Sequence, residues 1–231
     1  MKHPRDIVLL HGALGSSHDL EPLAKALGSA GFKCHTLTFS GHGSTPFAAH
    51  FGVPRFVSEL HNLLGEKNLQ RAPVFGYSMG GYVALYNAFV NNMHSGRIIT
   101  LGTKLHWTAA GLEKEKTILN PEAILQKSPA YAKALQQSHG QHWETLLAKT
   151  AAMMDEIVAR QFLNPEVFEQ IRNKTLLGRA ENDKMVSLAE TLGAMQALPH
   201  AQHYLIEGSH PLGTIQAEEL ARVIFDFTAG N

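Results

Sequence analysis

The sequence predicts an α/β fold: a mostly parallel sheet of about six strands, helices on both faces of the sheet, and a helical cap. Short apolar runs recur at long intervals along the chain, and most of them end at a glycine. Amphipathic stretches lie between most of these runs. Strands that alternate with helices are joined by right-handed crossovers, so they are expected to lie parallel in one sheet.

The predicted strands are short apolar runs. The first is DIVLLHG at 6–12, which shows no alternation of polar and apolar residues, as expected for a strand buried on both faces. The other predicted strands are 32–39, 72–76, 97–102, 174–178 and 202–208.

The predicted helices have apolar residues at helical spacing. In 19–31 the apolar positions Leu20, Leu23, Ala24 and Leu27 share one helical face. The other core helices are predicted at 55–68, 79–92, 187–198 and 214–228.

One interval breaks this alternation and predicts the cap. Roughly 70 residues between Gly102 and Lys174 contain no convincing strand. Three Asn-Pro or Ser-Pro pairs, at 120, 128 and 164, are typical of helix starts, and 141–162 predicts a longer amphipathic helix. We therefore predict a core formed by 1–103 and 173–231, with a cap at 104–172 inserted over the carboxyl ends of the strands.

Length and composition indicate an ordinary globular protein. The 231 residues suffice for one domain with an inserted subdomain. Twenty basic and 20 acidic residues balance, which argues against a nucleic-acid partner. The apolar run at 7–10 is too short for a signal peptide or a membrane span, and the single cysteine, Cys34, excludes an internal disulfide. A cytoplasmic protein without a membrane partner is expected; the oligomeric state is not predicted.

The stretch GYSMGG at 76–81 predicts a nucleophile. A G-x-S-x-G pattern between a strand and a helix places the serine in a strained turn, whose neighbours must be small. Gly76 and Gly80 meet that need. The turn would lift the Ser78 hydroxyl above the sheet, at the positive N-terminus of the next helix.

A nucleophilic serine needs a base, and the base needs an acid that orients it. RAENDKMV follows the predicted strand at 174–178, and SHPLG follows the strand at 202–208. Both segments should lie at the same sheet edge as Ser78. We predict His210 as the base and Asp183 as the acid, with Glu181 as the alternative acid.

Two further sets of groups should surround the serine. Backbone N–H groups of Ala13, or of Leu14, and of Met79 are predicted to form an oxyanion hole. The candidate residues for an apolar substrate pocket are Leu14, Trp107, Trp143 and Met153.

Other polar motifs favour structural roles. His11 and His42 are expected to hold loops by hydrogen bonds. His139 and His142 are three residues apart, as two metal ligands on a helix can be, but no third ligand is apparent, so no metal site is predicted. The GHG at 41–43 lacks the third glycine of a dinucleotide loop, so no cofactor is predicted.

Taken together, these motifs resemble the α/β-hydrolase superfamily in its short bacterial form with a helical cap. The resemblance rests on His11-Gly12, the GHG at 41–43, the turn at 76–81, Asp183 and His210, which occur in the order Ser, Asp, His. It implies a Ser-His-Asp hydrolase without a cofactor. The family's two usual leading strands are not expected here, so about six core strands are predicted rather than eight.

The GYSMGG motif is also similar to that of the pyruvate-eliminating enzymes of menaquinone synthesis. In that subgroup an arginine usually follows the motif, whereas this chain has Tyr82. We therefore predict hydrolysis of a small carboxylic ester, thioester or related acyl bond. One alternative is a lyase or C–C bond hydrolase acting on a keto-acid-type substrate, which requires a basic group in the pocket, Lys104 or Lys184. The other is a non-catalytic receptor for a small ligand.

Overall fold

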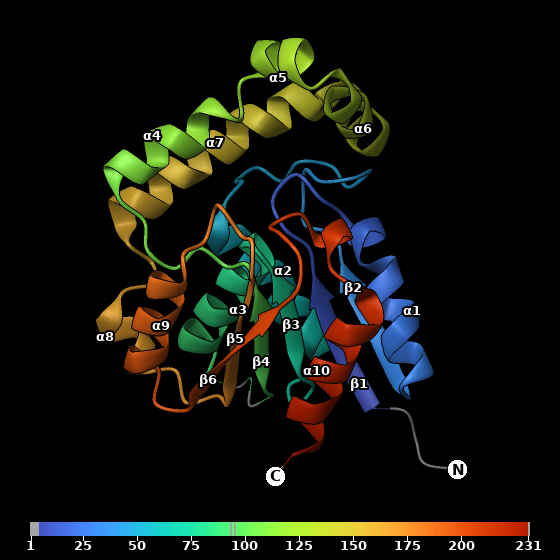
Figure 1. The fold of residues 1–231 in the computed structure, drawn as a ribbon, viewed down its shortest axis with the longest axis vertical. Helices are drawn as coiled ribbons and strands as arrows, with labels where there is room; N and C mark the ends of the chain where they lie inside the picture. The colour runs from blue at the N-terminus through green and yellow to red at the C-terminus, as the bar shows by residue number, and fades with distance from the viewer. Residues whose placement is uncertain (1–4, 93, 95, 231) are drawn as a thin grey trace.

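The computed structural model describes residues 5–92, 94 and 96–230; residues 1–4, at the start of the predicted core, lie outside it. Within the described residues the sheet has six strands, all parallel, in the order β2-β1-β3-β4-β5-β6. The strands are β1 (Arg5–Leu10), β2 (Phe32–Leu37), β3 (Val74–Tyr77), β4 (Ile98–Leu101), β5 (Thr175–Ala180) and β6 (Ala201–Ile206). The predicted parallel sheet is confirmed (Figure 1).

The central strands β1, β3, β4 and β5 are mostly buried on both faces of the sheet, which explains why their sequences are mostly apolar. The edge strands β2 and β6 are partly exposed. Successive side chains of a strand point to opposite faces. In β1, Val8 and Leu10 pack into one apolar cluster, while Ile7 and Leu9 pack into another. The expected helices cover both faces, so each face is buried against helices.

The core helices begin and end within a few residues of their predicted positions. Helices α2 (Val53–Glu66), α3 (Met79–Val90) and α9 (Leu188–Ala197) contribute to the first cluster. Helices α1 (Glu21–Ser29) and α10 (Ala217–Ala229) contribute to the second and pack against each other.

Five helices and a short 3₁₀ turn separate β4 from β5 within the described residues. They are α4 (Ala109–Thr117), α5 (Pro121–Lys127), α6 (Pro129–His139), the 3₁₀ turn at Gly140–His142, α7 (Trp143–Arg160) and α8 (Pro165–Phe168). Three of them begin at the prolines that marked helix starts in the sequence. Helix α4 was not predicted; its start is capped by Thr108, whose hydroxyl accepts a hydrogen bond from Gly111 N.

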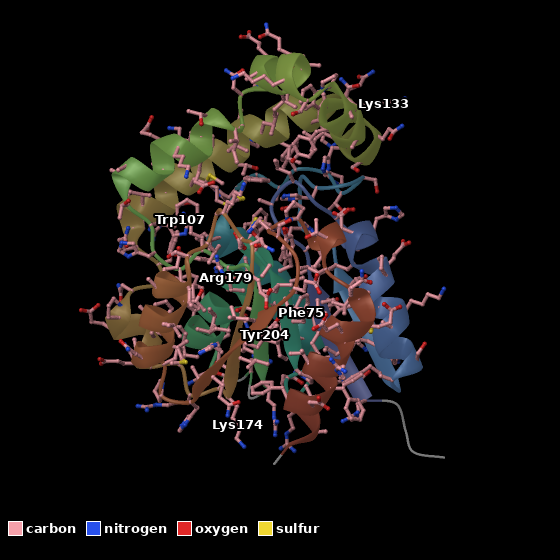
Figure 2. The ribbon with its side chains drawn as sticks, in the orientation of Figure 1. Phe75, Trp107, Lys133, Lys174, Arg179 and Tyr204 are labelled. Atoms are coloured by element: carbon pink, nitrogen blue, oxygen red, sulfur yellow. The ribbon has the colours of Figure 1, made fainter. Side chains whose placement is uncertain are left out.

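Four of these helices, α4 to α7, lie across the carboxyl ends of the strands (Figure 1). Helix α8 instead contacts α9 at the side of the sheet, and Phe168 packs into the first cluster of the core. Trp107 lies where the cap meets the core (Figure 2). The boundaries 104–172 for the cap remain a prediction. No helix in the described part of the chain is long and apolar enough to cross a membrane.

Candidate active site

Ser78 lies in a strained turn between β3 and α3. Its φ of 50° and ψ of −115° place a non-glycine residue in a sparsely populated backbone region. The turn is held by hydrogen bonds: Ser78 N donates to Leu101 O at 2.8 Å, and the Thr103 hydroxyl donates to Ser78 O at 3.0 Å. Backbone strain of this kind persists only where the surroundings impose it, which is typical of functional turns.

The glycines beside Ser78 are a steric requirement of this turn. A Cβ atom on Gly76 would collide with the backbone of Gly80 and Gly81. A Cβ atom on Gly80 would lie 2.6 Å from Leu10 O, on the neighbouring strand β1. The glycine spacing therefore reflects close approach of backbone segments on both sides of the serine.

His210 and Asp183 form a hydrogen bond. His210 Nδ1 lies 2.8 Å from Asp183 Oδ2, and the Asp183 side chain is buried. The second carboxylate oxygen accepts hydrogen bonds from Met185 N at 2.8 Å and Val186 N at 2.9 Å. Burial of this carboxyl acts to raise its pKa, but the hydrogen bonds from His210 and from the two backbone groups outweigh it and hold the pKa of Asp183 below its usual value.

The same geometry separates the two candidate acids. Glu181 is exposed, and the hydrogen bonds of its backbone tie it to Ile206 and Arg179. A Cβ atom on Gly102 would lie 3.3 Å from both Asp183 Oδ2 and His210 Nδ1. The Asp183–His210 pair thus packs against the end of β4, the strand beside β3.

Two supporting residues were not identified from the sequence. The Tyr77 hydroxyl donates to His210 O at 2.6 Å and so fixes the histidine's backbone. The Arg179 guanidinium donates to three backbone carbonyls of the loop between β5 and α9, which carries Asp183. These are the carbonyls of Glu181, Asp183 and Val186. The available signal was an arginine near the carboxyl end of a strand, since Arg179 belongs to β5. Its partners are backbone carbonyl oxygens, which have no sequence signature.

A cavity of about 330 Å³ lies between the cap and the carboxyl edge of the sheet; we call it the cap cavity. Ser78 and His210 both line it, and so do the predicted oxyanion residues Ala13 and Met79. The Met79 N–H belongs to the first turn of α3, where N–H groups lack partners within the helix. No hydrogen bond joins the Ser78 hydroxyl to His210 within the described residues; such bonds are often long before substrate binds.

Three of the four predicted pocket residues line the cap cavity: Leu14, Trp107 and Met153. Trp143 does not. It is buried in the cap's own apolar cluster with Leu119 and Leu147, because the first turn of α7 faces α5 and α6. Lining residues that the sequence did not single out include Ile118, Leu119, Tyr131, Ile157 and Met185.

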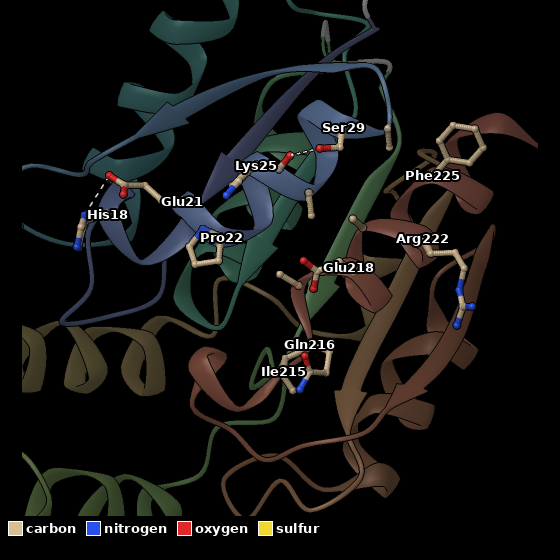
Figure 3. A pocket seen from close by; sticks show the side chains of 14 residues that line it. His18, Glu21, Pro22, Lys25, Ser29, Ile215, Gln216, Glu218, Arg222 and Phe225 are labelled. Atoms are coloured by element: carbon tan, nitrogen blue, oxygen red, sulfur yellow. Dashed lines mark hydrogen bonds and ion pairs between the residues drawn. The ribbon is translucent and has the colours of Figure 1, made fainter.

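A larger hollow, about 1040 Å³, lies between α1 and α10 (Figure 3). Its walls carry surface side chains such as Lys25, Glu218 and Arg222, and none of the predicted site residues lines it. The strained serine and the His210–Asp183 pair make the smaller cap cavity the candidate active site.

Two buried histidines support the loops beneath this cavity. His11 Nδ1 donates to Gly12 O at 2.7 Å and its Nε2 accepts from Phe39 N at 3.1 Å, so the ring is neutral. Burial lowers the pKa of His11 to about 4. Burial, with neighbouring His11 as a smaller cause, lowers the pKa of His42 to about 3. Both rings therefore act as neutral structural groups, as expected.

His139 connects the cap to the core. At the end of α6, its Nδ1 accepts from Gly43 N at 2.9 Å and its Nε2 donates to Leu14 O at 2.8 Å. Both ring nitrogens are thus engaged by loop backbone, which leaves neither for a metal. In the part of the chain that the structure describes, no group of three or more His, Cys, Asp or Glu side chains is placed to hold a metal ion.

Comparison with known proteins identifies the family. A model described as "Alpha/beta hydrolase family" matches residues 7–223. The match spans most of the chain, and the protein therefore belongs to the alpha/beta hydrolase family. The resemblance seen in the sequence motifs is thereby confirmed.

Solved structures of known hydrolases share this fold. The enol-lactonase from Burkholderia xenovorans matches with a TM-score of 0.77 and 16% identity, over 99% of this chain and 93% of that chain. The esterase from Thermogutta terrifontis matches with a TM-score of 0.78 and 16% identity, over 98% and 90%. At these identities the likeness concerns the fold.

Two curated relatives share a shorter segment. A sn-1-specific diacylglycerol lipase of Danio rerio is 34% identical over 83 residues, which are 36% of this chain and 26% of the lipase. A 2-succinyl-6-hydroxy-2,4-cyclohexadiene-1-carboxylate synthase of Yersinia pestis is 30% identical over 88 residues, 38% of this chain and 32% of the synthase. The matching segments thus cover about a quarter to a third of these relatives.

Proposed function

We propose that the protein hydrolyses a small carboxylic ester, thioester or related acyl bond through Ser78, His210 and Asp183. The observation that carries the proposal is the 2.8 Å hydrogen bond between His210 and Asp183, on a histidine that lines the same cavity as the strained serine. A buried carboxylate on Nδ1 holds the imidazole in the tautomer whose Nε2 is free to accept a proton.

The proposed reaction follows from these positions. Ser78 Oγ attacks the substrate carbonyl carbon as His210 Nε2 takes the hydroxyl proton. The resulting imidazolium is stabilised by the Asp183 carboxylate. The Met79 and Ala13 N–H groups stabilise the oxyanion, and His210 then protonates the leaving group. Water deprotonated by His210 releases the acyl group from Ser78 by the reverse sequence.

The walls of the cap cavity support an acyl substrate of modest size. Most lining side chains are apolar, among them Trp107, Met153 and Ile157. A cavity of about 330 Å³ is at the small end of the usual range for ligand sites, roughly 300–1,000 Å³. Hydrolases and a lipase among the similar proteins are consistent with this class of substrate.

A series of p-nitrophenyl esters with acyl chains of increasing length tests the proposal. Ser78→Ala should lower turnover by about 10³-fold or more, by analogy with removal of the nucleophile in other serine hydrolases. Ser58→Ala, an exposed serine on α2, is the matched control and should keep full activity. Equal activity of Ser78→Ala and wild type would show the proposal to be wrong.

A fluorophosphonate probe tests the serine independently of any ester. The probe should label wild type at Ser78 and fail to label Ser78→Ala. A folded wild-type protein that neither reacts with the probe nor hydrolyses the ester series would contradict catalysis and favour a small-ligand receptor.

A second candidate is a lyase or C–C bond hydrolase that uses the same three residues on a keto-acid-type substrate. One observation favours it: Lys104, a basic group, lines the cap cavity, whereas Lys184 is exposed and does not line it. Product analysis by mass spectrometry, with a keto-acid substrate set against the ester series, separates the two reactions.

A further inference from the structure

The cap cavity contains a pair of opposite charges in an otherwise mostly apolar wall. Apart from His210, the lining side chains that belong to the charged residue types Asp, Glu, Lys and Arg are Lys104 and Glu115. Lys104 lies in the loop after β4, and Glu115 lies on the cap helix α4. The pair therefore spans the junction between core and cap, inside the proposed substrate site.

The pair is held in place from several sides. Lys104 Nζ lies 3.3 Å from Glu115 Oε1 and donates to Met185 O at 3.3 Å. The Nζ atom also lies 5.6 Å from the centre of the Trp107 ring, and the Trp107 indole N–H donates back to Lys104 O at 3.1 Å. The Glu115 and Lys104 side chains are 8% and 19% exposed, so solvent screens the pair only in part.

These contacts should determine whether a charged substrate group can enter the cap cavity. A lone lysine in an apolar pocket would attract a carboxylate, because a buried cation is costly unless it is paired. Glu115 already supplies that negative charge. A second carboxylate entering the cavity would lose its hydration and meet Glu115 as well as Lys104, whereas an uncharged acyl chain avoids this repulsion.

We propose that Glu115 is a specificity-determining residue: by pairing with Lys104 it restricts the cap cavity to uncharged acyl groups and masks a latent carboxylate-binding site. The inference rests on the proposed acyl hydrolase function and names its substrate class. It also distinguishes this site from one built for keto acids, in which the basic group must be free to bind the substrate's carboxylate.

Two esters with acyl chains of equal length test the proposal: ethyl hexanoate, which is uncharged, and monoethyl adipate, which ends in a carboxylate. Ethanol release gives kcat/KM for each. Wild type should prefer ethyl hexanoate. Glu115→Gln, which keeps the side chain's shape but not its charge, should shift the ratio at least about tenfold toward monoethyl adipate, equivalent to about 1.4 kcal/mol. The shift should arise mainly in KM.

Three further variants test whether the change in substrate preference is due to the charge of Glu115 and its pairing with Lys104. Glu113→Gln removes an exposed carboxylate from the same helix and should leave the ratio unchanged. The double variant Lys104→Met/Glu115→Leu removes both charges and should lose the gain for monoethyl adipate. Glu115→Ala should shift the ratio in the same direction as Glu115→Gln, and it serves if the latter does not fold, as judged by thermal unfolding.

The inference is overturned if Glu115→Gln folds and hydrolyses ethyl hexanoate with an unchanged ratio. It is also overturned if the double variant gains as much for monoethyl adipate as Glu115→Gln, because Lys104 would then not be the group that binds the carboxylate. If wild type hydrolyses neither ester and the fluorophosphonate probe does not label Ser78, the proposed function fails rather than the specificity assignment.

Discussion

The carboxyl edge of the sheet and the cap above it are constructed on different principles. At the sheet edge, Ser78 follows directly after β3, and Asp183 and His210 lie in the loops just after β5 and β6. Close backbone contacts restrict the turn at Ser78. The cap consists of helices with a small apolar cluster of their own. Polar links to the core include those made by His139 and Lys104.

We expect this difference to separate the residues that carry the reaction from the residues that select the substrate. A strained turn crowded by backbone atoms has little room for variation, so the position of the proposed nucleophile, Ser78, depends on glycines and strand ends. The cap cavity is shaped partly by side chains from separate cap helices, so a change of one residue there should alter which substrate fits. Reaction chemistry should therefore be sensitive to the sheet edge, and substrate choice and stability to the cap junction.

The largest effect is expected at the sheet edge. Asp183→Asn should lower kcat by about 10³- to 10⁴-fold, because an amide cannot hold His210 in the required tautomer or stabilise its cation. Glu181→Gln is the matched control and should stay near wild type, since Glu181 is exposed. Steady-state kinetics on the preferred ester provides the comparison. A large loss in Glu181→Gln alone would reverse the assignment of the acid.

A smaller effect is expected at the cap junction. His139→Ala leaves Gly43 N and Leu14 O without their partner. An unpaired buried group costs about 1–3 kcal/mol in the free energy of unfolding, and the partly buried Leu14 O should cost less than the buried Gly43 N. Because Leu14 adjoins the predicted oxyanion donor Ala13, kcat should fall more than KM rises. Urea unfolding and steady-state kinetics measure the two effects.

His139→Gln offers a stringent check on this junction. Its amide can accept from Gly43 N and donate to Leu14 O, so it should recover much of the stability and of kcat. His142→Gln, three residues along, is the control and should change both quantities little. If His139→Ala and His139→Gln are equally impaired, the two hydrogen bonds do not explain the role of His139.

The smallest effect is a pH dependence of stability beneath the junction. His42 has a pKa of about 3 when folded, against about 6.5 when unfolded. Between these values the unfolded state binds a proton that the folded state does not, so stability falls as pH falls. From pH 7.5 to pH 5 the loss from His42 alone should be about 2 kcal/mol.

Denaturant unfolding at the two pH values measures this loss. His42 is buried beside His11, His139 and a group of phenylalanines, so His42→Phe preserves an aromatic ring and removes the titration. The variant should lose less stability on acidification than wild type does. His200→Gln, at an exposed position, should keep the wild-type dependence. An unchanged pH dependence in His42→Phe would assign the effect to other groups, His11 and His139 among them.

Much of the fold could be predicted because its signals are local. Continuous apolar runs indicate strands buried on both faces, and helix starts are marked by Asn-Pro and Ser-Pro pairs. Helix α4 escaped prediction because AAGLEKEKT has few apolar residues and includes a helix-weakening glycine. The helix begins at the Thr108 cap, whose hydrogen bond from Gly111 N is recognisable only in the folded backbone.

Not every predicted pocket residue lines the cap cavity. Trp143 was expected to line the cavity, but whether a cap residue faces the core or another cap helix depends on how the helices pack. Arg179 and Tyr77 act on backbone carbonyls, and the pairing of Lys104 with Glu115 joins residues whose proximity depends on the placement of α4. Neither kind of contact has a sequence pattern.

By itself the sequence determined the order of strands and helices, the glycine-flanked turn at Ser78, and the strand ends that carry Asp183 and His210. These depend on periodicity and on steric limits that act between neighbours in the chain. Only the tertiary structure shows that Asp183 rather than Glu181 forms a hydrogen bond with His210. The same holds for the hydrogen bond from His139 in the cap to Leu14 O, and for the ion pair between Glu115 and Lys104. Those outcomes depend on distances between segments far apart in sequence, which are set by the packing of the cap on the sheet.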